Sequence, residues 1–565
     1  MNDYDVCITG SGAGGGAVAW RLTQAGFRVL VLEKGPWFTE ADYFKDELAC
    51  CRRSVYTPDL RDEPQVVEEL DGDDWEATPT SEADYDFWNG NVVGGSSNFM
   101  SGFFHRLKPV DFRLRSEFGP ITGANVVDWP IGYADLEPYY AEAEHVIGIS
   151  GKVVPHRFLE PRSTPDFPYP PTLEHPVSRW IDEACAQLGF QSLPLPRAVL
   201  SQPKGKRRSC EYAGYCGSYG CATGAKGSAR AALLDEAVAS GRCEVRPHSQ
   251  VLRLASDARG RVTGAVYRDQ AGKQHTATAR LYVVACQAVE TSRLLLLSRG
   301  PRHPQGLGNR FGQVGRNLLF SGGGISHGVF RHAELDAERA AQVRAVGPFV
   351  NRTLHDWYVI DDPQLGRIKG GVMDFLFHHP NVVSRATALT RDDNGKLVWG
   401  TALKRRMEEK IRGERRIDCE VFVDWLPTEN CFVSLDPTLR DKWGQPVARV
   451  RVGAHPHDLV AGQHLAEKGR QVLAAIGARD TVASVSPAPP TNLMAGGCRF
   501  GNDPKSSVLD ADCRVHGAEN LFVADGSFMP TGGSVPYTWT IYANALRVGD
   551  KIAAQLGHPL VTSTA

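Results

Sequence analysis

Short apolar runs and small-residue turns alternate at the start of the chain. Residues 6–9 form an apolar, β-favouring run, and residues 17–24 follow as an alanine-containing helical segment closed by Gly26. Residues 27–32 form a second apolar run, which ends at Glu33. This order predicts a strand, a helix and a second strand, the βαβ unit from which parallel sheets are built.

The apolar pattern changes character along the chain. Further strand-like runs are found at 243–246, 250–254, 261–267, 276–286 and 520–524. In between, 367–377 and 419–426 have the composition of antiparallel strands. We therefore predict an α/β protein with a Rossmann-like dinucleotide-binding domain and an inserted antiparallel-sheet substrate domain of α+β type.

These patterns also predict where the domains meet. We assign 1–324 and 486–565 to the cofactor domain and 325–485 to the substrate domain. Two stretches with little periodicity, the polar 37–90 and the proline-rich 151–200, are expected to be excursions that contribute to the substrate side.

Composition narrows the class of protein. With 565 residues, 42% hydrophobic and 23% charged, the chain is an ordinary globular one, too long for a single compact core. Its 63 basic and 65 acidic residues give a net charge of -2, which offers no electrostatic argument for binding nucleic acid or an anionic membrane. No apolar run approaches the ~20 residues of a membrane span, and no signal peptide precedes the first strand, so we expect a cytoplasmic protein.

The first turn carries the clearest chemistry. Gly10, Gly12 and Gly15 have G-x-G-x-x-G spacing between the predicted strand and helix, and Glu33 ends the second strand. Gly10 permits the tight turn, Gly12 lets a pyrophosphate approach the backbone, and Gly15 lets the helix pack closely on the strand. The helix N-terminus offers free N–H groups to phosphate oxygens, and Glu33 can accept hydrogen bonds from a ribose. The sequence therefore predicts a dinucleotide site, without separating FAD from NAD.

A second glycine-rich stretch carries a family resemblance. The residues from Val93 to Phe112, VGGSSNFMSGFFHRLKPVDF, resemble a signature of the glucose-methanol-choline (GMC) flavin oxidoreductases. The segments 129–144, 281–298 and 520–530 resemble other parts of the same family. The resemblance implies FAD as the cofactor and the oxidation of an alcohol by hydride transfer to flavin N5.

The resemblance also assigns residues to the cofactor. Gly94, Gly95, Ser96 and Ser97 would lie beside the flavin diphosphate and isoalloxazine. Val251 stands where the family often contacts adenine through backbone groups. Asp525 and the backbone after it would reach the ribityl chain and the diphosphate, while a closing helix over 540–550 would point its N-terminus at the flavin ring.

One departure from the family concerns the catalytic base. The family places a His at the start of an H-x-x-G-G/T segment and a His or Asn shortly before a closing T-I. Here Leu493 and Pro536 stand at those positions, with Val535 as the alternative if the register slips by one. None of these side chains can accept a proton.

Three other residues are candidates for this role. Asp424 lies roughly where some relatives, cholesterol oxidases among them, place an active-site carboxylate. Tyr537 adjoins the vacant position and is predicted to contact the cofactor and to hold a substrate oxygen, and His105 follows the flavin-side signature. The structural alternatives remain open, because Asp424 could pair with an arginine, Tyr537 could pack, and His105 could be a hydrogen-bonded core histidine.

Three clustered cysteines suggest a second cofactor. The chain has 13 cysteines, an odd number that indicates reduced thiols, and Cys210, Cys216 and Cys221 have C-x5-C-x4-C spacing. Three thiolates this close could bind an iron–sulfur cluster or zinc. The segment resembles the FAD subunits of bacterial fructose and glucose dehydrogenases, with one extra residue in its second gap. That gap is more similar to the paromamine dehydrogenases of aminoglycoside antibiotic biosynthesis, for which the resemblance implies no cluster.

We therefore expect an FAD-dependent oxidoreductase that oxidises a hydroxyl group of a sugar, aminocyclitol or nucleoside. Its small-molecule alcohol would reduce the flavin, and oxygen or a redox partner would reoxidise it. Two alternatives are a redox-neutral lyase or isomerase on the same fold, and a catalytically silent FAD-binding subunit.

Overall fold

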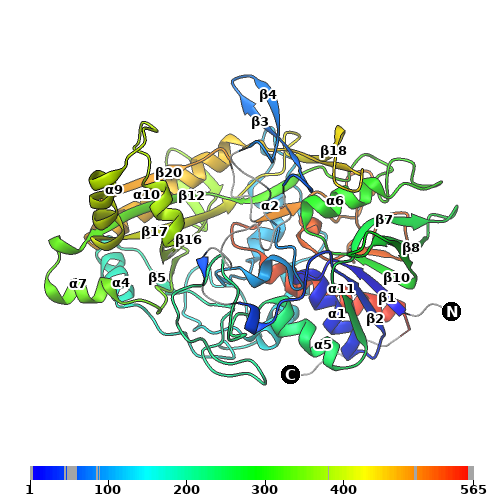
Figure 1. Cartoon of the computed structure of the whole chain (residues 1–565), viewed down its shortest axis with the longest axis horizontal. Coiled ribbons are helices and arrows are strands. Elements are labelled where there is room, and N and C mark those ends of the chain that lie inside the picture. Colours follow the sequence, from blue (N-terminus) through cyan, green and yellow to red (C-terminus); the bar gives the residue numbers. More distant parts are fainter. Residues whose placement is uncertain are drawn as a thin grey trace.

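The computed structural model describes residues 4–43, 46–47, 60–83, 87, 89–378, 381–488 and 493–557. Two sheets of different kinds dominate it, at opposite ends of the long axis (Figure 1). The smaller of the two is parallel and lies near the N-terminus, and the larger is antiparallel.

The parallel sheet has five strands in the order β22-β10-β1-β2-β6. Its strands are β1 (Tyr4–Thr9), β2 (Val29–Leu32), β6 (Cys243–Arg246), β10 (Ala279–Val284) and β22 (Leu521–Val523). All four strand pairings are parallel, and β1 lies at the centre between β2 and β10. The βαβ unit predicted at the N-terminus therefore has its expected place, and the last strand arrives from the far end of the chain.

Helices bury the faces of this sheet. Helix α1 (Ala13–Gln24) packs against α11 (Thr538–Gln555), which in turn packs on α3 (Tyr133–Ala143). The close contact between α1 and α11 depends on a glycine at position 549, because a Cβ atom there would lie 2.7 Å from Cγ of Arg21. Helices α5 (Asp235–Ala239) and α6 (Ala288–Leu297) lie in the same half of the molecule (Figure 1). A three-stranded antiparallel sheet lies beside the parallel sheet. Its strands are β7 (Gln250–Ser256), β8 (Val262–Arg268) and β9 (Gln274–Ala277).

The antiparallel sheet follows the order β20-β12-β17-β16-β13-β5, and β11 joins β17 to β21. Its strands are β5 (Ser192–Pro194), β11 (Leu318–Gly322), β12 (Gly324–Arg331), β13 (Arg352–Leu354), β16 (Gly371–Phe377), β17 (Glu414–Asp424), β20 (Arg479–Val485) and β21 (Met494–Gly496). Helices α4 (Val177–Leu188) and α10 (Pro456–Ala475) bury an apolar core against one face of it. The α/β fold with an antiparallel-sheet region, predicted from the sequence, is confirmed.

Strands outside the expected ranges take part in these sheets. Strand β5 comes from the proline-rich excursion 151–200, and β11 and β21 lie just outside 325–485. Part of the expected loop region 37–90 forms a hairpin of β3 (Val66–Asp71) and β4 (Asp74–Pro79), which joins β18 (Phe432–Arg440) and β19 (Pro446–Arg451) in a four-stranded sheet. The domain boundaries themselves stay a prediction.

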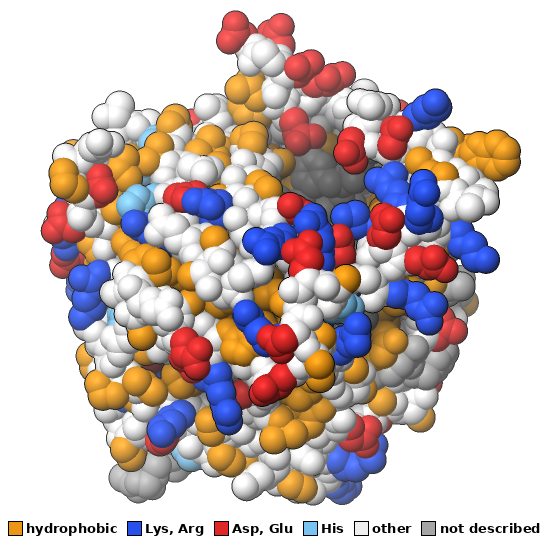
Figure 2. All heavy atoms as spheres, turned by 90° about the vertical axis from the view of Figure 1, so that its left-hand side faces the viewer, with side chains coloured by type: hydrophobic (Ala, Val, Ile, Leu, Met, Phe, Trp, Pro, Cys, Tyr) orange, Lys and Arg blue, Asp and Glu red, His pale blue; other side chains and the backbone are white. Residues whose placement is uncertain are grey.

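The remaining elements are short and lie mostly at the surface. They are α2 (Leu114–Phe118), α7 (Ala337–Arg344), α8 (Val382–Ala388), α9 (Gly400–Met407), β14 (Val359–Asp362) and β15 (Gly366–Lys369). Figure 2 shows the face on the α7 and α9 side, where basic and acidic side chains are interspersed and acidic ones gather on the projecting β3–β4 hairpin. Across the part of the chain that the structure describes, no helix has the length and apolar content needed to cross a bilayer.

Candidate active site

A cavity of about 970 Å³ connects the glycine-rich turn of the parallel sheet with one face of the antiparallel sheet. Gly10 and Gly12 line it at one end, and Ile325 and Phe422 line it from the antiparallel sheet. Its size and its position between two sheets are typical of a cofactor and substrate site.

The three glycines of the first turn have separate positions. Gly10 has a φ of +90°, and a Cβ atom there would lie 2.3 Å from the carbonyl oxygen of Ala285. On Gly15 a Cβ atom would lie 2.0 Å from the carbonyl oxygen of Gly10, so Gly15 lies behind the cavity and permits the helix to pack on the turn. A Cβ atom on Gly12 would have its nearest neighbour 4.0 Å away, which leaves the backbone open to the cavity.

Glu33 lines the cavity, and its carboxylate already accepts hydrogen bonds from protein donors. Oε2 accepts hydrogen bonds from the backbone N–H of Ser11 at 3.0 Å and from the Ser11 hydroxyl at 2.6 Å. Oε1 accepts one from the N–H of Gly35 at 2.9 Å. These bonds fix the carboxylate against the turn, with lone pairs left for a further donor.

The second glycine-rich segment lies against the first. Gly95, Ser96 and Ser97 line the cavity, whereas Gly94 is turned away, and a Cβ atom on it would meet Arg230 at 2.8 Å. The Ser96 and Ser97 hydroxyls hold the segment's own backbone: that of Ser96 accepts from the N–H of Gly90, and that of Ser97 donates to the carbonyl of Gly94. Here the backbone, more than the side chains, faces the cavity.

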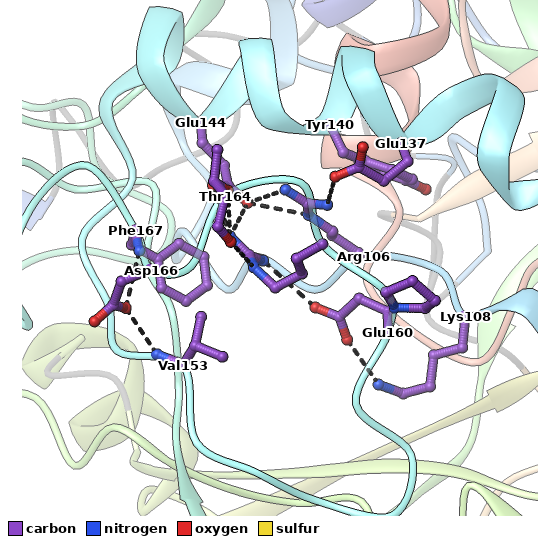
Figure 3. Close-up of polar contacts among 12 residues, drawn as sticks. Arg106, Lys108, Glu137, Tyr140, Glu144, Val153, Glu160, Thr164, Asp166 and Phe167 are labelled. Atoms are coloured by element: carbon purple, nitrogen blue, oxygen red, sulfur yellow. Dashed lines mark hydrogen bonds and ion pairs between the residues drawn. The ribbon is translucent and has the colours of Figure 1, made fainter. Parts of the chain in front are cut away.

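Buried ion pairs hold the chain that leaves this segment. The Arg106 guanidinium donates to Glu144 at 2.6 Å and to Glu137 at 2.9 Å, and Lys108 donates to Glu160 at 3.1 Å (Figure 3). These charges are buried and paired with opposite charges. They hold the segment 105–108, which includes His105, in place behind the cavity.

Val251, Asp525 and Tyr537 also line the cavity. Asp525 accepts hydrogen bonds from the backbone N–H groups of Ser527 at 2.9 Å and of Gln287 at 3.0 Å, and burial raises its pKa. The Tyr537 hydroxyl is buried and has no hydrogen-bond partner among the described residues. Burial, followed by the nearby negative charge of Asp424, raises the pKa of Tyr537 well above 10.0. An orphaned hydroxyl at the N-terminal end of α11 is suited to a bound molecule.

Leu493 and Pro536 both face the cavity, so the two positions at which the resemblance expects a proton acceptor are apolar. The structure does not bring Asp424 or His105 to the cavity lining. Asp424 accepts hydrogen bonds from the N–H of Gly533 at 2.5 Å and the Ser534 hydroxyl at 2.9 Å. His105 pairs with Asp374 at 3.0 Å and lines a separate, smaller cavity.

The sequence analysis missed one titratable residue of the lining. Glu420 on β17 lines the cavity, and among the described residues no hydrogen bond contributes to its electrostatics. Burial and the neighbouring carboxylates of Asp374 and Asp418 raise its pKa to about 7. The site therefore contains a carboxyl group that changes protonation state near neutral pH.

The three clustered cysteines do not form the expected metal site. Among the described residues, no group of three or more His, Cys, Asp or Glu side chains is placed to hold a metal ion. Cys221 Sγ instead lies 3.4 Å from the Thr223 hydroxyl and accepts from the N–H of Lys226 at 3.5 Å, and Cys210 Sγ accepts from the N–H of Tyr212 at 3.4 Å. Two of the three thiols thus have hydrogen-bond partners within their own loop, and an iron–sulfur cluster is not supported.

Comparison with known protein families agrees with this arrangement. Two GMC oxidoreductase models match residues 76–320 and 427–545, and an NAD(P)-binding Rossmann-like model matches 8–38. The chain belongs to the GMC oxidoreductase family. It is accordingly an FAD-dependent oxidoreductase of the type that acts on CH–OH groups.

Members of this family at moderate identity span almost the whole chain. A 2-methyl-1,2-propanediol dehydrogenase from Mycolicibacterium austroafricanum is 32% identical over 556 residues, covering 97% of this chain and 95% of the relative. A paromamine 6'-oxidase from Streptomyces fradiae is 31% identical over 563 residues, covering 98% and 92%. Among solved structures, a formate oxidase from Aspergillus oryzae studied for modification of its FAD has a TM-score of 0.63 at 16% identity, covering 98% of this chain and 99% of that one.

The cavity fits the cofactor of this GMC oxidoreductase. Gly12 leaves room for a phosphate beside the start of α1. Glu33 directly follows β2, the position from which an acidic side chain can accept hydrogen bonds from a ribose. The N-terminus of α11 faces the same cavity. The roles of individual residues toward FAD stay predictions.

Proposed function

We propose that this GMC oxidoreductase oxidises a hydroxyl group of a polar small molecule, a sugar, aminocyclitol or nucleoside, to the carbonyl. The observation that carries the proposal is the continuity of the cavity from the glycine-rich turn to the antiparallel sheet. The Tyr537 hydroxyl there has no protein partner among the described residues, and Glu420 lines the same cavity. Similarity to enzymes named for paromamine and for 2-methyl-1,2-propanediol supports a polyhydroxylated or amino-substituted alcohol.

In the mechanism that we propose, FAD held in this cavity would supply the acceptor for the hydride of the substrate carbon. The protein holds the substrate carbon toward the flavin and excludes water, since Phe422, Leu493 and Pro536 make that part of the lining apolar. The Tyr537 hydroxyl donates a hydrogen bond to the substrate oxygen, and Asp424, which holds the 533–534 turn, positions the chain just before Tyr537.

We assign the domains accordingly. Residues 1–324 and 486–565 would supply the cofactor half of the site and 325–485 most of the substrate half. Either oxygen or a redox partner would reoxidise the flavin.

The test is anaerobic reduction of the purified holoprotein by a panel of polyols, aminoglycosides and nucleosides. The proposal predicts that the flavin absorbance bleaches with at least one of them and that the product is two hydrogens lighter than the substrate. A product of unchanged mass would favour a redox-neutral isomerase, and two fragments whose masses sum to that of the substrate would favour a lyase. A protein inert to the whole panel would favour a silent FAD-binding subunit.

A further inference from the structure

Strand β17 has two faces with opposite character. Cys419, Val421 and Val423 point into the apolar core under α10. Because side chains alternate along a strand, Glu420 and Phe422 point to the other face, where both line the cavity. Ile325 lies opposite Glu420 in the pairing with β12 and lines the same wall. The position of Glu420 in the cavity thus follows from the register of the sheet.

Two carboxylates, those of Asp374 and Asp418, lie close to Glu420. Asp374 of β16 lies directly opposite it in the strand pairing, and Asp418 precedes it by two residues on the same face. Like charges this close disfavour a third ionised carboxylate. The nearby cation Arg197 acts in the opposite direction and lowers the pKa of Glu420. Asp374 itself pairs with His105. Asp418 pairs with Arg416 and His378 and interacts more weakly with His327. With burial, these neighbours raise the pKa of Glu420 to about 7.

Apart from Tyr537, the other titratable groups of the described lining already have protein partners. Lys34 pairs with Glu63, Arg293 pairs with both Glu290 and Asp441, and Glu33 and Asp525 accept the backbone hydrogen bonds described above. The Cys286 thiol donates to the carbonyl of Thr9 at 3.3 Å, and burial raises its pKa well above 9.0. Tyr537 has a free hydroxyl, but its raised pKa keeps it protonated, so it serves as a donor and not as an acceptor.

We propose that Glu420 is the proton acceptor for the substrate hydroxyl, in place of the residues that Leu493 and Pro536 replace. The inference rests on the proposed function and deepens it. The Glu420 carboxylate takes the proton of the O–H group. Bound FAD would supply the acceptor for the hydride of the same carbon, so that the C–O bond would become C=O. Glu420 then returns the proton to solvent before the next cycle.

Asp374 and His105 act through Glu420. The Asp374 carboxylate sits between the two, since His105 Nε2 lies 3.0 and 3.2 Å from its oxygens and Glu420 faces it across the strand pair. Both side chains of the His105–Asp374 pair are at most 3% exposed, so solvent does little to screen the Asp374 carboxylate from Glu420. We regard them as positioning residues, which set the protonation of Glu420 without touching the substrate.

The experiment compares wild-type holoenzyme with Glu420→Gln, Glu420→Asp, Asp374→Asn and the surface control Glu409→Gln. The first readout is the rate constant of anaerobic flavin reduction by a substrate found in the panel, from pH 5 to 9, at matched FAD content. We expect Glu420→Gln to lower it by about 10²- to 10⁴-fold and to abolish its rise through neutral pH. Glu420→Asp should recover part of the rate, and Asp374→Asn should move the rise to lower pH.

The second readout does not depend on turnover. Infrared difference spectra of the holoprotein should show a protonated carboxyl group that titrates near neutral pH in the wild type and in Glu409→Gln, and that is missing in Glu420→Gln. Wild-type rate and pH profile in Glu420→Gln, or persistence of that carboxyl signal, would overturn the inference while leaving the proposed function intact. A wild-type flavin that no substrate reduces would instead overturn the proposed function.

Discussion

A Cβ atom on Gly95 would lie 2.9 Å from Cα of Gly12, so the two glycine-rich segments meet backbone to backbone at the wall of the cavity. The Ser11 hydroxyl links them by accepting a hydrogen bond from the N–H of Gly94 at 3.0 Å while donating to Glu33. A single bound pyrophosphate could therefore contact both segments through main-chain N–H groups, which explains why neither offers a charged side chain there.

Substitution of these glycines should separate cofactor binding from folding. Gly12→Val places its side chain in open space, so we expect a fold of near wild-type stability that retains little FAD. Gly15→Ala drives Cβ onto the Gly10 carbonyl and should lower the free energy of unfolding by about 1–3 kcal/mol. Flavin content after gel filtration and urea unfolding measure the two effects, and equal loss of both in Gly12→Val would contradict the assignment.

Removing the orphaned hydroxyl of Tyr537 should leave the fold intact. A buried hydroxyl without a partner destabilises the protein, so Tyr537→Phe should unfold at the same or a slightly higher temperature without substrate. The loss of a donor to the substrate oxygen should lower kcat/KM by about 10- to 100-fold. Thermal unfolding and anaerobic reduction kinetics test this, and unchanged kinetics would show that Tyr537 does not contact the substrate.

Asp424 should act on structure more than on chemistry. Its carboxylate holds Gly533 and Ser534, and Lys369 donates to the same Ser534 hydroxyl at 2.7 Å. Asp424→Ala leaves these donors without an acceptor and should lower the free energy of unfolding by about 2–4 kcal/mol, against no change in the exposed control Asp393→Asn. If Asp424→Asn abolished flavin reduction without loss of stability, Asp424 would be the proton acceptor instead of Glu420.

The pH dependence of stability offers a separate test of Glu420. Its pKa is raised from 4.5 to about 7 in the folded protein, so between these values the folded chain binds more protons than the unfolded one. The stability linked to this group is fully present below about pH 4.5 and is lost as the pH rises toward 7. The difference in unfolding free energy between wild type and Glu420→Gln should fall across this window and be level above it. A difference independent of pH would contradict the raised pKa.

The cofactor half of the site was predictable because local chemistry determines it. The G-x-G-x-x-G spacing can be read from a dozen residues, and the structure places Gly10, Gly12, Glu33, Gly95 and Asp525 around one cavity. Glu420 was harder to find because its role depends on the register between β16 and β17, which brings Asp374 opposite it. The available signal was the period of two along β17, which puts Asp418, Glu420 and Asp424 on one face, where only Glu420 reaches the cavity.

Spacing alone does not decide the role of the three cysteines. They lie within a dozen residues, in a loop with positive φ at Tyr212 and Ser218, and the Cys210 and Cys221 thiols accept hydrogen bonds from backbone N–H groups of the same loop. The hairpin of β3 and β4 was missed because its partner strand β19 comes from a distant part of the sequence.

The most direct measurement is the amount of FAD released when purified protein is denatured with acid. We expect one equivalent per wild-type chain and a small fraction of that in folded Gly12→Val. A folded wild-type protein that carries no flavin and takes up none from solution would contradict this expectation.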